Sequence, residues 1–216
     1  MLFARRGWLG TGCSPPAIRP ATQLGVMRQS TRMETRADFD ANLNRLIGFV
    51  INRVNYFEID YQDGRPYFRD HPETGHFLDF GVEMLDSSGR CACITWDGTF
   101  FQYGLGVFVD CPSGEVMAGL SYDVTNEPEW MPFIGRRISH VDSYWSWVAD
   151  DMEPNAKRTY YPQDIRLTFD NNRHMYFSAA QFLNDSGKLF GMSDNVLIVF
   201  NDDVAERHQL GPWAVA

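Results

Sequence analysis

Acidic and aromatic side chains that could do chemistry gather between residues 120 and 155 of this chain. Paired carboxylates beside aromatic rings are the arrangement with which glycoside hydrolases hold and cleave a sugar. The same combination suits an interface, where aromatic anchors surrounded by acids bind a basic protein. The candidate partner-binding residues are Glu127, Glu129, Trp130, Asp142, Tyr144, Trp145, Trp147, Asp150, Asp151 and Glu153.

Three functions are open for these residues. The first is a non-enzymatic protein-binding domain, which accounts together for the aromatic content, the excess of acids and the lack of a catalytic motif. The second is a domain that binds or hydrolyses carbohydrate. The third is a structural domain without a ligand, in which the acids form a solvated edge and Trp145 and Trp147 pack inward. We favour the first, and we assign no catalytic residue.

The sequence carries no motif of another catalytic or cofactor site, such as G-x-S-x-G or a Walker loop. Gly104 and Gly106 lack the third glycine and the helix of a dinucleotide site, so we expect a bulge or a close backbone approach there. His71 and His76 flank a glutamate, but Pro72 in this stretch is incompatible with the helix of a zinc protease motif. We therefore predict a solvated loop, no metal and no cofactor.

The cysteines predict free thiols. Cys91 and Cys93 lie two apart on a predicted strand and cannot bond to each other without breaking its geometry. Four cysteines without a C-x-x-C pair do not form a disulfide framework. The alternative is a disulfide from Cys91 or Cys93 to Cys111 across neighbouring strands.

The net charge of the 216-residue chain is −9, and it is unevenly placed. Residues 1–33 hold five of the 19 basic residues and no acid, so the remainder, with 14 basic and 28 acidic residues, carries −14. An acidic body repels nucleic-acid phosphates and attracts a basic protein partner. Nucleic acid is therefore not an expected partner. No apolar run approaches the ~20 residues of a membrane span, so a membrane is not expected either. The oligomeric state is not indicated.

The chain divides at about residue 33. Residues 1–33 are rich in Pro and Gly without a hydrophobic period, which predicts a disordered lead, or an extension upstream of a true start at Met27 or Met33. A transit peptide and a lipoprotein signal ending at Cys13 are the alternatives. Residues 34–216 are predicted to form a single α+β domain, mainly antiparallel β-sheet with a short N-terminal and a short C-terminal helix.

The pattern of residues places the elements of this domain. A helix is expected from an Asp38 cap, and a meander of strands over 77–85, 90–96 and 99–109 with a two-residue turn at Asp97 and Gly98. Residues 110–161 are expected to be a long connection with partial structure. Alternation predicts strands over 164–169 and 174–179, a five-residue apolar run predicts a strand covered on both faces over 196–200, and Asn201 or Asp202 caps a final helix.

The C-terminal part carries a resemblance. Residues 161–169, 178–180 and 196–205, a sheet followed by a capped helix after an apolar strand, resemble small acidic bacterial immunity-type proteins of polymorphic toxin systems. The resemblance implies a cytoplasmic protein that binds and blocks a toxin domain without catalysis. It carries no diagnostic motif and assigns no binding residue.

Overall fold

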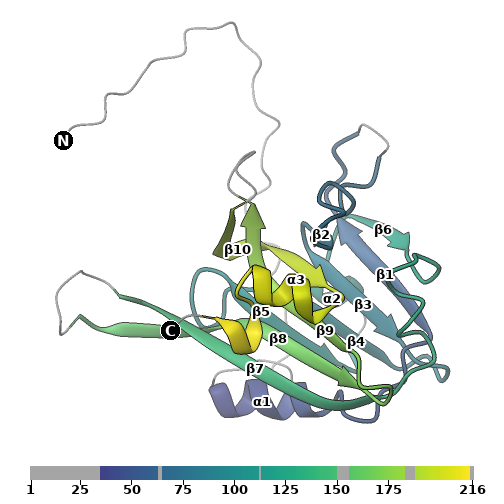
Figure 1. Ribbon diagram of the computed structural model, residues 1–216, viewed down its shortest axis with the longest axis horizontal. Helices are drawn as coiled ribbons and strands as arrows, with labels where there is room; N and C mark the ends of the chain where they lie inside the picture. The colour runs from purple at the N-terminus through teal and green to yellow at the C-terminus, as the bar shows by residue number, and fades with distance from the viewer. Residues whose placement is uncertain (1–34, 63–64, 112, 150–155, 183–187, 215–216) are drawn as a thin grey trace, which may run out of the picture. The chain divides into compact units, whose positions relative to one another are not determined.

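The computed structural model describes residues 35–62, 65–111, 113–149, 156–182 and 188–214, and these residues build two five-stranded antiparallel sheets with short helices (Figure 1). The α+β class, the dominance of antiparallel sheet and the helices near both ends of the domain are confirmed. The predicted lead, residues 1–33, lies outside the described residues. No helix in the described part of the chain is long and apolar enough to cross a membrane.

The first sheet contains the predicted meander. Its central strands pair in sequence order, with Glu83 opposite Cys93 and Cys93 opposite Phe108. Cys91 and Cys93 are free thiols, so the alternative of a disulfide to Cys111 is wrong; the Cys91 thiol instead donates to the Cys111 carbonyl oxygen at 2.8 Å. In spatial order the strands are β5 (Gly104–Val109), β4 (Cys91–Asp97), β3 (Gly81–Leu85), β1 (Arg53–Glu58) and β6 (Leu120–Asp123).

The second sheet holds the C-terminal strands. Three of them form the antiparallel order predicted from alternation, and Val196 to Val199 are fully buried in a strand with neighbours on both sides. In spatial order the strands are β2 (His76–Leu78), β10 (Leu189–Val199), β9 (His174–Phe182), β8 (Arg158–Phe169) and β7 (Ile138–Ala149).

The main hydrophobic core lies between the sheets. Val82 and Ile94 of the first sheet belong to the same buried cluster as Leu167, Phe177 and Ile198 of the second. Each fully buried side chain of this size contributes about 1.5–3 kcal/mol to the transfer free energy. A smaller cluster covers the opposite face of β9 and β10, beneath α3 (Asp202–Arg207) and the 3₁₀ helix η3 (Gly211–Trp213).

Helix α1 (Arg36–Asn44) begins one turn earlier than predicted. Thr35 is its N-cap, and Asp38 occupies the third helical position, where its carboxylate accepts the Thr35 backbone N–H at 2.9 Å. The two residues form a reciprocal capping box, so Asp38 caps the helix as the partner of Thr35. At the other end, Asn201 caps α3 as expected, because the Val204 N–H donates to its side chain at 2.9 Å.

The expected turn after β4 is wrong, and the long connection that follows β5 contains a long strand. Asp97 and Gly98 do not form a two-residue turn; the loop extends over 98–103, and the Asp97 carboxylate accepts the Thr99 N–H at 2.8 Å. Residues 110–161, predicted to be a long connection with partial structure, contain α2 (Ser113–Val116), β6 and the twelve-residue strand β7, which pairs along β8. Pro162, which cannot donate to the ladder, lies in β8 where the register shifts.

Candidate functional site

Strand β7 forms one wall of a hollow of about 810 Å³. The other walls come from β8, from the outer half of β10 and from residues 208–214 at the end of the described chain. Trp145 and Trp147 line it, and side chains two apart on a strand share a face. Tyr144, Tyr161 and Phe190 also line it, and we call this hollow the aromatic pocket.

The ring of Trp145 is a fixed part of the wall. Its indole N–H donates to the Ser143 hydroxyl at 3.2 Å, and its edge packs against Phe39 and Phe100 with ring centroids 5.5 and 4.9 Å away. The Arg36 guanidinium lies 5.1 Å from its centroid. Helix α1 and the loop before β5 therefore support the pocket from behind.

The rim of the pocket exposes large aromatic side chains. Trp147 is 40% exposed and Phe190 is 45% exposed. Tyr160, directly opposite Trp147 on the neighbouring strand, is 51% exposed. The guanidinium of Arg158 lies 4.0 Å from the centroid of the Trp147 ring, so the face of this ring already binds a cation.

Asp164 is a buried acid that lines the aromatic pocket. Its Oδ2 accepts the Gly211 backbone N–H at 2.9 Å, whereas Oδ1 has no hydrogen-bond partner among the described residues. Burial raises the pKa of Asp164 to about 6, although hydrogen bonds from Ser178, Gly211 and Gln163 oppose the shift. The carboxyl group therefore ties the C-terminal segment to β8 and is partly protonated in mildly acidic solution.

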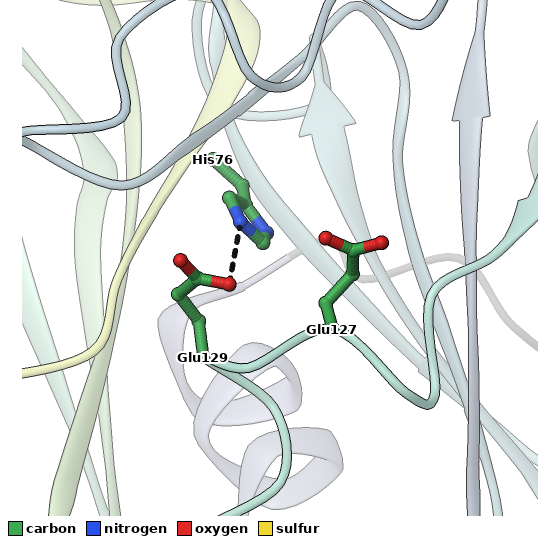
Figure 2. Close-up of side chains that lie close together, drawn as sticks. All are labelled: His76, Glu127 and Glu129. Carbon is green, nitrogen blue, oxygen red and sulfur yellow. Dashed lines mark ion pairs between the residues drawn. The ribbon is translucent and has the colours of Figure 1, made fainter.

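A second group of ionisable side chains lies outside the aromatic pocket. His76, Glu127 and Glu129 each offer one ligand atom, and these atoms all lie within 4.8 Å of one another. Figure 2 shows the imidazole with a carboxylate on either side, both rising from the same segment of chain. We call these three residues the His76 cluster.

The imidazole of His76 is held by the core. The Tyr56 hydroxyl lies 2.6 Å from Nδ1, and the Trp130 indole N–H donates to the same hydroxyl at 2.5 Å. The rings of Phe68 and Phe200 contact the imidazole edge to face, at 5.2 and 4.9 Å. Burial lowers the pKa of His76, and the charges of Glu129 and Glu127 offset part of this shift.

The two glutamates of the cluster differ in their partners. The Glu127 carboxylate accepts two hydrogen bonds from the Arg69 guanidinium, at 2.5 and 3.3 Å. Glu129 is 41% exposed, and its Oε2 lies 3.5 Å from the His76 Nε2. That distance exceeds an ordinary charge-assisted hydrogen bond, which is about 2.7–2.9 Å long.

Comparisons of this chain with known protein families, with curated proteins and with solved structures each found no match.

The predicted partner-binding residues fall into two places. Tyr144, Trp145 and Trp147 line the aromatic pocket, and Asp142 lies earlier on the same strand, where its Oδ2 accepts the Arg166 guanidinium at 2.8 and 2.9 Å. Glu127, Glu129 and Trp130 lie in the segment between β6 and β7 instead. Asp150, Asp151 and Glu153 lie outside the described residues.

Two expectations about single residues need correction. Trp130 is fully buried and hydrogen bonded to Tyr56, so its ring is part of the core and not a surface anchor. His76 does not lie in a solvated loop, because it begins β2 and is only 4% exposed. Its clustering with glutamates some fifty positions later has no signal in the sequence, because the fold alone brings them together.

Proposed function

We propose that this chain is a non-enzymatic binding protein that holds a basic protein partner at the aromatic pocket. The observation that carries the proposal is a hollow of about 810 Å³ whose lining includes two exposed rings, Trp147 and Phe190. The exposed ring of Tyr160 lies opposite Trp147 on the neighbouring strand. Interface energy concentrates in such aromatic anchors, and few other residues contribute much.

The charge of the chain supports a basic partner. Residues from Glu34 onward carry −14, and Asp150, Asp151 and Glu153 directly follow the strand that bears Trp147. Opposite charge mainly raises the association rate and selects the partner. The Arg158 guanidinium lies on the Trp147 ring, which remains 40% exposed, and a basic side chain of the partner could bind the exposed part of the ring in the same way.

An immunity-like role is the specific form of this proposal. In that role the chain acts in the cytoplasm and blocks a basic toxin or effector by occupying its surface, as the C-terminal resemblance implies.

Affinity capture with the full chain tests the proposal. We expect the wild-type chain to retain a basic protein at low salt and to retain less of it at high salt, because ions screen the attraction. Trp147→Ala should weaken retention about tenfold or more, which is the range of interface anchors. Ile59→Ala, a change at a 43% exposed residue outside the pocket, is the matched control and should bind as the wild type does. Equal retention by Trp147→Ala and the wild type would contradict the proposal.

Carbohydrate binding is the second candidate, because the pocket has the volume of a small-ligand site, about 300–1,000 Å³. Its rings could stack on sugar faces, and a titration of tryptophan fluorescence with oligosaccharides tests this. Hydrolysis has less support, since Asp164 is the single carboxylate among the described residues that line the pocket.

A further inference from the structure

The His76 cluster has the composition of a metal site. One imidazole nitrogen and two carboxylate oxygens form a donor set that suits zinc and its neighbours among divalent transition metals. Three protein ligands are also the number that a site needs when it leaves a coordination position for water or for a partner's group. In Figure 2 all three side chains point toward a common space.

The orientation of the imidazole favours a metal site over a cluster of ionisable side chains that binds no ion. His76 is 4% exposed, and its Nδ1 contact with Tyr56 leaves Nε2 turned toward Glu129. The Tyr56 oxygen has two lone pairs, so it can accept both the Trp130 N–H and a proton on Nδ1. In that tautomer Nε2 presents a lone pair to the carboxylates, and Tyr56 takes the place of the outer partner that orients metal-binding histidines.

The contact between His76 and Glu129 is long, and its length suits two ligands of one ion. The Nε2 of His76 and the Oε2 of Glu129 lie 3.5 Å apart, which is too long for a strong hydrogen bond. Ligand atoms around a tetrahedral zinc, with bonds of 2.0–2.2 Å, lie about 3.3–3.6 Å apart, so this pair is already placed. Each Glu127 oxygen accepts one hydrogen bond from Arg69 and keeps a second lone pair that an ion can use, and the ligand atom of Glu127 lies within 4.8 Å of the other two.

We propose that His76, Glu127 and Glu129 bind one divalent transition-metal ion, zinc in the first place. The ion would fasten the segment between β6 and β7 to the first residue of β2, two parts of the chain that otherwise meet through Tyr56 and Trp130. The site is separate from the aromatic pocket, because none of its three residues lines that hollow.

Calorimetric titration of the full, chelator-treated chain with ZnCl₂ tests this site. We expect an ion at the His76 cluster and a rise in Tm with zinc, because an ion that binds only the folded state stabilises it. Glu129→Gln is the decisive variant, since the Glu129 side chain is 41% exposed and glutamine has nearly the same size and shape. It should weaken binding at this site at least tenfold. Glu73→Gln is the matched control, because Glu73 is an exposed acid 4.0 Å from the ring of His71.

Thiols also bind zinc, and Cys91 and Cys93 are free. They are unchanged in Glu129→Gln, so zinc bound by thiols persists in that variant and zinc bound by the His76 cluster is lost. A parallel titration with MnCl₂, followed by electron paramagnetic resonance, uses an ion that prefers oxygen and imidazole to sulfur. The proposal would be overturned if Glu129→Gln bound zinc as strongly as the wild type. It would also be overturned if the wild type bound neither ion at concentrations up to about 1 mM.

Discussion

Tyr56 and His76 belong to different sheets, yet the Tyr56 hydroxyl and the His76 Nδ1 lie 2.6 Å apart in the core. The same hydroxyl accepts the indole N–H of Trp130, in the segment that joins the sheets. One oxygen thus satisfies polar groups from two other parts of the chain. All three side chains are nearly or fully buried, so water cannot replace a lost partner at low cost.

Tyr56→Phe should therefore destabilise the protein although it removes a single atom. The change leaves the Trp130 N–H and the His76 Nδ1 without a partner, and we expect a loss of about 2–4 kcal/mol in the free energy of unfolding. Urea unfolding followed by fluorescence measures it. Tyr160→Phe, at a 51% exposed ring, should change stability by less than about 0.5 kcal/mol. A loss as small for Tyr56→Phe would show that this contact contributes little.

Asp164 should make stability depend on pH in the mildly acidic range. Its folded pKa of about 6 lies above the ordinary value of 3.8, so the folded state binds a proton more readily than the unfolded state. The stability contributed by this group is complete below pH 4 and is lost as the pH rises through 6, by roughly 3 kcal/mol at most.

Asp164→Asn removes this dependence and keeps an oxygen for the Gly211 N–H. As the pH rises from 4.5 to 7.5, the variant should become more stable relative to the wild type, as measured by the free energy of unfolding. Urea unfolding at several pH values measures that difference. If the two proteins show parallel pH profiles, the carboxyl group at this position does not titrate as described.

Glu58 gives a second pH effect in a higher range. Burial raises the pKa of Glu58 from 4.5 to about 7, with the Asp79 and Asp70 charges adding to the shift, while backbone N–H groups of Tyr67 and Phe68 oppose it. Protonation stabilises the folded state, so stability from this group falls as the pH rises from about 4.5 through 7. As the pH rises across that range, the Tm of Glu58→Gln should increase relative to the Tm of the wild type. Glu206→Gln, at an exposed acid of α3, should follow the wild-type profile.

The sequence predicts those elements whose residues repeat with the period of the element. Alternation in residues 164–169 and 174–179 and the apolar run of 196–200 correctly place strands of the second sheet, because burial of one or both faces leaves a pattern. The strand β7 and the start of β8 were not predicted, because prolines punctuate this part of the sequence. Pro162 indicates a break in a strand unless the bulge that accommodates it is known.

The sites are harder to predict than the strands because distant residues build them. Trp145 and Trp147 could be paired from their spacing alone, but the walls from β10 and residues 208–214 depend on the sheet order. His76 lies 51 positions before Glu127, and its stretch contains Pro72 and Gly75, which indicate a loop. A contact of this kind follows from which strands become neighbours, and a local pattern does not record it.

Gly119 and Gly48 allow a test of backbone packing with a built-in control. Both have a left-handed backbone, with φ of +96° and +90°, so alanine at either position costs about 1 kcal/mol in backbone strain. The two positions differ in the space that is available for a Cβ atom. A Cβ on Gly119 would lie 2.1 Å from the Glu58 carbonyl oxygen, whereas a Cβ on Gly48 meets nothing within 4 Å. Leu120 pairs with Glu58 in the β1–β6 ladder, so relief of the clash requires these strands to separate.

We therefore expect Gly119→Ala to lose about 2 kcal/mol more than Gly48→Ala in the free energy of unfolding, because overpacking against backbone cannot be relieved by a side-chain rotation. Urea unfolding of both variants measures the difference, and strain from φ cancels between them. Hydrogen exchange should show faster opening at the β6 edge in Gly119→Ala alone. Equal losses in the two variants would mean that β6 does not lie against Glu58 as closely as the strand pairing places it.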